Sequence, residues 1–148
     1  MNSCFNYLLL PFSVLYRFII LFRNFCYDKN FIKANQLPCD VISVGNIGFG
    51  GTGKTPTVLY LCRMLQKNKK KDIAILSRGY KRNTSGTVLA SSGNGPLKNW
   101  QAVGDEPFMM AQKTKNIPIV VDSNRYRGGK FLIKNFNSKI IILDDGFQ

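Results

Sequence analysis

The chain of 148 residues contains no histidine, and it has only eight acidic residues against twenty-one lysines and arginines. Without histidine, it cannot by itself form a catalytic triad with a histidine base or a histidine-ligated metal site. The shortage of acid leaves a formal net charge of +13, which predicts an anionic partner: nucleic acid, a lipid surface or a phosphorylated small molecule. Composition does not choose among these three.

Cysteine also occurs without a recognisable pattern. The chain has four, Cys4, Cys26, Cys39 and Cys62, and no two of them form a CxxC pair. This excludes the ligand spacing of zinc sites and the motif of dithiol redox proteins. We therefore expect buried, unpaired thiols in a reducing cytosol rather than a disulfide framework. The apolar fraction of 45% is ordinary for a folded domain and excludes a disordered or low-complexity chain.

A long apolar run free of charge is missing too, although the amino-terminal segment comes close to one. Residues 5–25 are rich in Phe, Tyr and Leu, but Arg17 and Arg23 interrupt them and Pro11 lies among them. The segment only just reaches the roughly 20 apolar residues of a spanning helix. No basic residue precedes it and no small-residue cleavage site follows, which argues against a signal peptide.

Three interpretations of this segment remain open. It is a helix in the membrane interface with its arginines extended to the headgroups, a short membrane span, or a buried helix of a soluble core. We favour membrane contact because apolar side chains occur all round the segment and leave no wide polar face. The positive residues toward its carboxyl side place the rest of the chain in the cytoplasm.

From residue 39 onward, apolar runs of strand length alternate with segments of helical periodicity. Strands are predicted at 40–44, 73–76, 87–90, 117–121 and 139–143, and helices at 55–66, 106–113 and 125–135. This alternation is typical of βαβ units and predicts an α/β fold, a parallel sheet with flanking helices on both faces. We divide the chain into a membrane-associated helix with its linker, residues 1–38, and a second domain, residues 39–148.

The strongest motif joins the first of these strands to the first of these helices. It matches G-x-x-x-x-G-K-[ST] and consists of Gly48, Phe49, Gly50, Gly51, Thr52, Gly53, Lys54 and Thr55. Glycines let successive backbone N–H groups surround phosphate oxygens, and the following helix directs its positive dipole end to them. The lysine reaches the terminal phosphates, and the threonine hydroxyl is a ligand for Mg²⁺. Residues 39–148 are therefore predicted to form a P-loop NTPase-type domain that binds a nucleoside triphosphate.

Four of the eight acidic residues stand in two adjacent pairs. Asp144 and Asp145 follow an aliphatic strand, whose carboxyl end delivers them beside the phosphate loop, where P-loop proteins hold Mg²⁺. A strand-terminal turn is the alternative, since the sequence Asp-Asp-Gly favours turns. Asp105 and Glu106 begin a helix, where interaction with the helix dipole accounts for them as well as a catalytic role does.

Several motifs occur together in order along the chain. VGN precedes the phosphate loop, and it is followed by SRGY at 77–80, GDEP at 104–107, VD with an arginine at 121–125, and LDDGFQ at 143–148. In this order they resemble the tetraacyldisaccharide 4′-kinases, the lipid A 4′-kinases of Gram-negative bacteria. The resemblance implies a membrane-associated P-loop kinase at the cytoplasmic face of the bacterial inner membrane. Its reaction would transfer the γ-phosphate of ATP, with Mg²⁺, to the 4′-hydroxyl of a tetraacylated glucosamine disaccharide 1-phosphate.

Position by position, the resemblance makes residues 48–55 the ATP loop and Asp105 the carboxylate that helps to deprotonate the sugar hydroxyl. It assigns to the Mg²⁺ and phosphate environment Thr55, Glu106, Asp144 and Asp145. Arg78 and Arg125 lie in motifs of the family, but a solvated basic face explains them equally well.

Members of the family continue beyond LDDGFQ with a histidine and a second lobe that carries another catalytic histidine. The resemblance therefore implies that these 148 residues are the amino-terminal part of such a kinase. We expect little or no kinase activity from this part alone, because the lobe that completes the acceptor site is missing from it.

Two other classes of function compete with this interpretation. A membrane-associated P-loop regulatory ATPase often carries lysine where this loop has Phe49, which counts against that class. A nucleic-acid-binding protein is suggested by the stretch from Arg63 to Arg82, in which eight basic residues stand against one acid. Such a protein would interleave aromatic residues, and only Tyr80 does so. We expect this stretch to face anionic lipid and substrate phosphates, with no nucleic acid partner.

Overall fold

The structure, a computed structural model, describes residues 3–29, 31, 35–45, 53–68, 70 and 72–145, with side chains from residue 12 onward. The chain divides into two compact units, Met1–Gln36 and Leu37–Gln148, which are described separately. The second unit carries the predicted phosphate loop and both acidic pairs.

The first unit contains the helix α1 (Ser3–Asp28), which covers the predicted amino-terminal segment. Its described large apolar side chains are exposed except for the half-buried Ile20, and Phe18 and Phe22 have exposed fractions of 66% and 70%. Near its carboxyl end the rings of Phe25 and Phe31 lie 6.5 Å apart, and the Lys29 ammonium lies 6.0 Å from the Phe25 ring. Among the residues that the structure describes, no helix has both the length and the apolar character required to cross a membrane.

The second unit is built on a five-stranded sheet with the strand order β1-β5-β2-β4-β3. Its strands are β1 (Asp40–Val44), β2 (Ile73–Ser77), β3 (Val88–Ser91), β4 (Ile119–Val121) and β5 (Ile140–Asp144). The first four strands in that order pair in parallel, whereas β3 pairs antiparallel with β4 and carries a register shift between Leu89 and Ser91. The sheet is therefore mixed, which corrects the prediction of a wholly parallel sheet.

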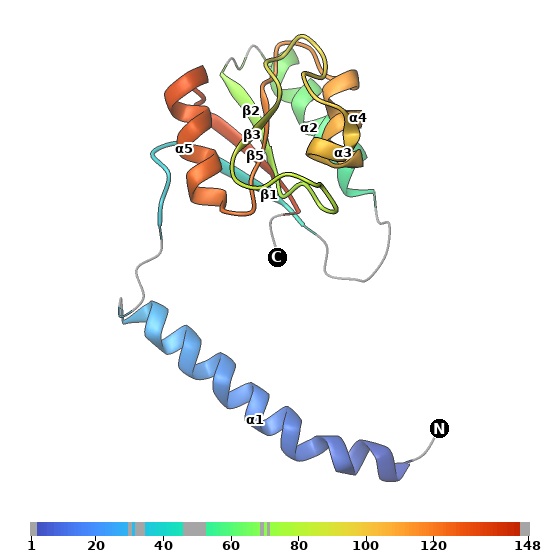
Figure 1. The fold of residues 1–148 in the computed structure, drawn as a ribbon. Coiled ribbons are helices and arrows are strands. Elements are labelled where there is room, and N and C mark those ends of the chain that lie inside the picture. Colours follow the sequence, from blue (N-terminus) through green and yellow to red (C-terminus); the bar gives the residue numbers. More distant parts are fainter. Residues whose placement is uncertain are drawn as a thin grey trace. The chain divides into compact units, whose positions relative to one another are not determined.

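Helices cover both faces of this sheet, as predicted (Figure 1). They are α2 (Lys54–Lys67), α3 (Trp100–Val103), α4 (Asp105–Lys113) and α5 (Arg125–Phe136). Residues of α2 and α4, such as Val58 and Met110, pack with Ile75 and Ile142 in one apolar cluster. Leu132 of α5 packs with Leu76 in the cluster on the other face. Neighbouring residues of one strand thus serve opposite faces, which explains why all five positions of β2 are buried.

The local sequence accounts for the ends of the helices that frame the site. α2 begins after Gly53, whose φ of 77° lies in the left-handed region that favours glycine. The Asn124 side chain caps α5 by accepting a hydrogen bond of 2.9 Å from the backbone N–H of Arg127, and α5 ends at the left-handed Asn137. The short helix α3 was not predicted, because one turn is too short to show helical periodicity.

Candidate functional site

The two predicted acidic pairs and the start of α2 come together at one edge of the sheet. This edge is formed by the carboxyl ends of the parallel strands, where open α/β sheets hold their ligands. Residues 48–52 of the predicted phosphate loop lie outside the described part of the chain. The described part of that motif begins at Gly53 and continues with Lys54 and Thr55 into α2.

Lys54 and Asp145 form the most direct link across this edge. The Lys54 ammonium donates a hydrogen bond of 2.6 Å to Asp145 Oδ1, and both side chains are 22% exposed. This hydrogen bond raises the pKa of Lys54, so the ammonium stays charged at neutral pH. Thr55, one residue further, is buried in the first turn of α2. The pairing holds the lysine of the phosphate motif beside the end of β5, as the sequence predicted.

Asp144 differs from its neighbour because it is completely buried. Its Oδ2 accepts a hydrogen bond of 3.0 Å from the Ser77 hydroxyl, whereas its buried Oδ1 has no hydrogen-bond partner among the described residues. Burial raises the pKa of this carboxyl, and the nearby charge of Asp145 acts in the same direction. A buried carboxylate oxygen without a partner costs folding free energy unless a ligand completes it.

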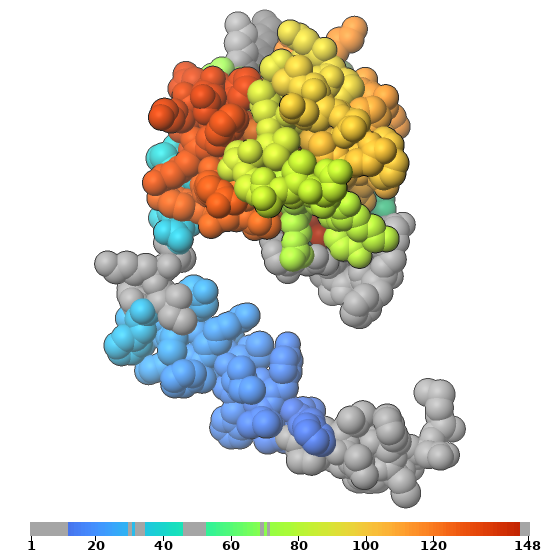
Figure 2. All heavy atoms as spheres, in the orientation of Figure 1, coloured from blue at the N-terminus to red at the C-terminus, as the bar shows by residue number. Residues whose placement is uncertain are grey.

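Asp105 and Glu106, the first residues of α4, line the same pocket as Lys54 and Asp145. The pocket has a volume of about 420 Å³, and Tyr80, Lys81 and Pro107 complete its lining. Partial burial raises the pKa of Glu106, and the nearby Asp144 carboxylate raises it further. In Figure 2, the lime-coloured connection between β2 and β3 lies on the viewed face, with red atoms from the end of β5 beside it.

The acids of this edge fit a magnesium ion that is completed by phosphate oxygens. No cluster of three or more potential protein ligands is assembled among the described residues. Mg²⁺ commonly takes only one or two carboxylates and fills its other positions with water and substrate phosphates. The unpartnered Oδ1 of Asp144 is the kind of hard oxygen ligand that this ion prefers. Thr55, Glu106 and Asp145 keep their assignment to the metal environment as predictions.

The two arginines of the predicted motifs occupy different surroundings. Arg125 Nη2 donates to the backbone carbonyls of Asp144 and Asp145 at 3.4 and 3.1 Å, and its Nε is buried. Burial, followed by the nearby charge of Arg78, lowers the pKa of Arg125. The solvated basic face is therefore the wrong interpretation for Arg125. Arg78 is exposed, and it lines a second pocket of about 330 Å³ beside the first.

Two contributors to this edge were not singled out from the sequence. In the sequence Ser77 stands out only as part of the SRGY motif, yet among the described residues it supplies the one hydrogen bond that the Asp144 carboxylate accepts. Lys81 was counted only within the basic stretch, yet it lines the pocket with Lys54. Their position at the end of β2 is the signal that could have identified them, since the carboxyl ends of parallel strands share one edge.

Comparisons with known proteins identify the family of this chain. Residues 5–148 match the LpxK family model, described as tetraacyldisaccharide-1-P 4′-kinase. A curated tetraacyldisaccharide 4′-kinase from Aquifex aeolicus is 47% identical over 140 residues, which cover 95% of this chain and 44% of that relative. The protein of the same name from Flavobacterium psychrophilum is 46% identical over 141 residues, covering 95% and 39%.

A solved structure shows the same fold. It is LpxK from Aquifex aeolicus, described as an "apo" form in complex with ATP, and it superimposes with a TM-score of 0.80 at 46% sequence identity. The match covers 95% of this chain and 44% of that chain. The chain thus spans less than half the length of the relatives it matches, and the sequence resemblance and the α/β architecture of the second unit are confirmed.

Proposed function

The chain belongs to the tetraacyldisaccharide-1-P 4′-kinase family, and from that premise we propose that it forms the nucleotide-binding part of a lipid kinase. The reaction is transfer of the γ-phosphoryl group of ATP to the 4′-hydroxyl of a tetraacylated glucosamine disaccharide 1-phosphate. The observation that carries the proposal is the 2.6 Å pairing of Lys54 with Asp145 in a pocket that Asp105 also lines. The lysine proposed to bind phosphate, the acid after β5 and the carboxylate proposed as the base all line this one pocket, which supports the proposal.

In this proposal the nucleotide phosphates bind at the start of α2. Lys54 exchanges its contact with Asp145 for the terminal phosphates, and the helix directs its positive end toward them. The residues assigned to the phosphate loop are Gly48, Phe49, Gly50, Gly51, Thr52, Gly53, Lys54 and Thr55. The ATP named for the Aquifex aeolicus structure supports this assignment, because the two chains are 46% identical over the shared region.

Magnesium would be held by Asp144 and Thr55, with Glu106 and Asp145 in its surroundings. The buried, unpartnered Oδ1 of Asp144 supports this choice. When bound, the ion would neutralise charge on the phosphates.

Asp105 is proposed as the catalytic carboxylate on the acceptor side. It begins α4 at the pocket wall and is exposed, so a sugar hydroxyl can approach it. The 4′-oxygen attacks the γ-phosphorus, the bond between that phosphorus and the bridging oxygen breaks, and ADP leaves. Asp105 accepts the hydroxyl proton, and Lys54 stabilises negative charge on the phosphates.

We further propose that α1 holds the protein at the cytoplasmic face of the inner membrane, where the acylated acceptor resides. Exposed aromatic and aliphatic side chains along α1, together with Arg17 and Arg23, suit a helix that lies in the lipid interface. The net charge of +13 favours an anionic lipid surface. Flotation of the chain with vesicles containing anionic lipid tests this, and replacement of Phe18 and Phe22 by serine should weaken the binding.

The central experiment measures ATP binding to the 148-residue chain by calorimetry with Mg²⁺ present. Lys54→Ala should weaken binding by about 10- to 100-fold, the range expected for a charge-assisted contact of about 1.5–3 kcal/mol. Lys67→Ala removes the same charge at the exposed far end of α2 and serves as the control. Equal affinity in the Lys54→Ala variant and the wild type would overturn the proposal.

A second measurement separates the kinase from a regulatory ATPase. A kinase of its relatives' full length should transfer labelled phosphate from ATP to the lipid acceptor, and Asp105→Ala in such a protein should reduce this transfer while ATP binding survives. Because the chain spans less than half of its relatives, we expect little transfer from the 148 residues alone. ATP hydrolysis at an ordinary enzymatic rate that does not change when the acceptor is added would instead favour a regulatory ATPase.

A further inference from the structure

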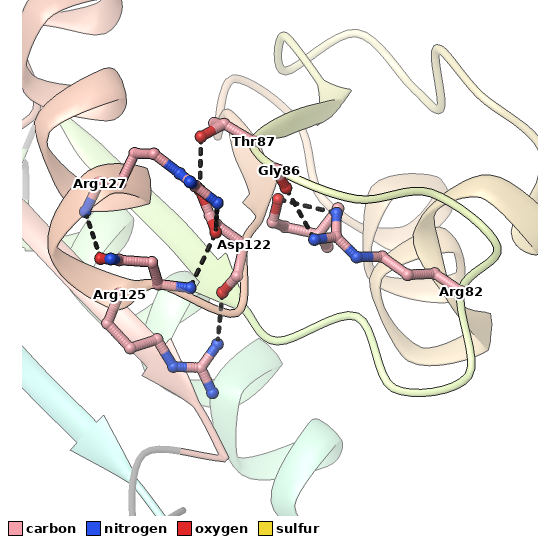
Figure 3. A network of polar contacts seen from close by, with 8 residues as sticks. Arg82, Gly86, Thr87, Asp122, Arg125 and Arg127 are labelled. Carbon is pink, nitrogen blue, oxygen red and sulfur yellow. Dashed lines mark hydrogen bonds and ion pairs between the residues drawn. The ribbon is translucent and has the colours of Figure 1, made fainter.

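A second completely buried aspartate, Asp122, lies directly after β4 and outside the lining of the nucleotide pocket. Its carboxylate accepts two hydrogen bonds from Arg127, Nε to Oδ2 and Nη2 to Oδ1, both of 2.8 Å. It also accepts one from the Thr87 hydroxyl and one of 2.8 Å from the backbone N–H of Asn124 (Figure 3). Burial opposes ionisation, but these hydrogen bonds hold the pKa of Asp122 below its ordinary value.

These contacts anchor the segment that we call the basic loop, residues 78–87 between β2 and β3. Thr87 binds the Asp122 carboxylate, and Arg82 donates to the backbone carbonyl of Val121 at 3.1 Å and to that of Gly86 at 2.7 Å (Figure 3). The end of β4 therefore holds this loop through two of the loop's own side chains, the guanidinium of Arg82 and the hydroxyl of Thr87.

The opposite flank of the basic loop is attached to α3. The Asn83 backbone N–H donates to the Gln101 carbonyl at 2.8 Å, and the Thr84 hydroxyl donates to the Ala102 carbonyl. Between the end of β2 and the first of these anchors, Arg82, the loop presents Tyr80 and Lys81 to the nucleotide pocket. Lys81 has a φ of 58°, a left-handed conformation that a lysine keeps only where its surroundings maintain it.

The backbone of Asp122 is also joined to the acidic pair. Arg125 Nη1 donates to the Asp122 carbonyl at 3.2 Å, and its Nη2 reaches the carbonyls of Asp144 and Asp145 (Figure 3 labels Arg125 and Asp122). A displacement of the Asp122 backbone would therefore shift both the basic loop and the end of β5. The nucleotide residues Lys54 and Thr55 come from a separate element, the start of α2.

We propose that Asp122 is a positioning residue that, paired with Arg127, fixes the basic loop so that Tyr80 and Lys81 face the acceptor side of the pocket. This inference rests on the proposed kinase function. The acceptor is an anionic lipid, and a loop with its cations held in place binds such a ligand at a lower entropic cost than a loose one. Asp122 does not touch the reacting atoms, and its effect passes through the loop.

The test compares two variants of the pair with a matched control in the 148-residue chain. Asp122→Asn removes the charge at almost unchanged size, and Arg127→Gln removes the forked partner. Lys134→Gln takes the same charge from the exposed side of α5 and is the control. Thr87→Val removes one hydroxyl and leaves the ion pair, so it serves if either of the first two variants fails to fold.

Hydrogen exchange followed by mass spectrometry is the first readout. Amides of residues 78–87 should exchange on the order of tenfold faster in Asp122→Asn and Arg127→Gln, while those of β2 and α2 keep their wild-type protection. Lys134→Gln should match the wild type. Unchanged protection of the loop in the folded variants, or equal loss of protection throughout the unit, would overturn the proposal.

Ligand binding is the second readout, with Mg-ATP and, for the part of the acceptor site that this chain carries, with a tetraacylated disaccharide 1-phosphate in mixed micelles. The variants should bind the acceptor about fivefold or more weakly. They should bind ATP within about twofold of wild type, since Arg125 bonds the backbone carbonyl of Asp122, which the substitutions keep. Equal weakening of both ligands would indicate a merely structural residue. Failure of the wild type to bind ATP would count against the kinase proposal, and the exchange measurement would still decide the role of Asp122.

Discussion

Asp122 and Asp144 are both completely buried at the carboxyl ends of strands that flank β2, yet their surroundings differ in kind. Asp122 accepts bonds from Arg127, Thr87 and the Asn124 backbone, and its pKa lies below the ordinary value. Asp144 has a hydrogen bond from Ser77, an unpartnered oxygen among the described residues, and a raised pKa.

This difference shows that two buried aspartates at one edge of a sheet can have different roles, one in stabilising the fold and one in binding a ligand. A carboxylate whose hydrogen bonds are complete stabilises the fold and has little capacity left for a ligand. An incompletely bonded carboxylate costs stability, and such a cost is typical of residues that a ligand completes. Burial alone would not have distinguished the two aspartates.

The largest effect is expected from Asp144→Asn, measured as the magnesium dependence of ATP binding by calorimetry. If Asp144 ligates the ion, its loss should lower the apparent magnesium affinity by more than the roughly 10- to 100-fold that outer-shell partners contribute. Asp122→Asn should leave this affinity nearly unchanged. Equal effects of the two substitutions on magnesium affinity would contradict the proposal that Asp144 is a magnesium ligand and Asp122 is not.

The second prediction concerns the free energy of unfolding, measured by urea denaturation without Mg²⁺. Asp122→Asn should destabilise the chain by about 2 kcal/mol, the range for hydrogen bonds to charged groups. The cost stays below that of a fully buried ion pair because Arg127 is 54% exposed and can be solvated. Asp144→Asn should change stability by less than about 0.5 kcal/mol or increase it, since it removes a poorly bonded charge.

The pH dependence of that 2 kcal/mol provides a third test. The pKa of Asp122 is lowered in the folded state, so its contribution is complete above the unfolded pKa of about 4 and is lost as pH falls through the folded value. The stability difference between wild type and Asp122→Asn should be constant from pH 7 to about 5 and shrink below about pH 4. A difference that grows on acidification would contradict the assigned hydrogen bonds.

The smallest effect is expected from Thr87→Val, which removes one of the bonds to Asp122 and keeps the ion pair with Arg127. We expect a loss of about 1 kcal/mol, the typical contribution of one hydrogen bond. Thr84→Val is the useful comparison, because Thr84 bonds a backbone carbonyl of α3 instead of a carboxylate. A larger loss from Thr84→Val would place the principal anchor of the basic loop at α3.

Much of the second unit could be predicted from residue pattern. The predicted strand at 40–44 coincides with β1, and the predicted helix at 125–135 differs from α5 by one residue at its end. The direction of β3 was not predictable, because pairing depends on how the connection from β2 returns and not on the residues of β3 itself. The short α3 was not predicted because a single turn shows no helical periodicity. A capping residue was present, since the Asn99 side chain accepts a hydrogen bond from the Ala102 N–H.

The sequence by itself determined the α/β alternation, the phosphate motif that ends in Lys54 and Thr55, and the acids at the end of β5, because these depend on local periodicity and spacing. Tertiary structure alone decided which buried acid is completed and which is left open. The partners of Asp144 and Asp145, Ser77 and Lys54, stand 67 and 91 residues away in the chain and meet them only when the sheet assembles. Of the four bonds that complete Asp122, three come from residues two to five positions along the chain, and the fourth comes from Thr87, 35 residues away, which meets Asp122 only when β3 pairs with β4.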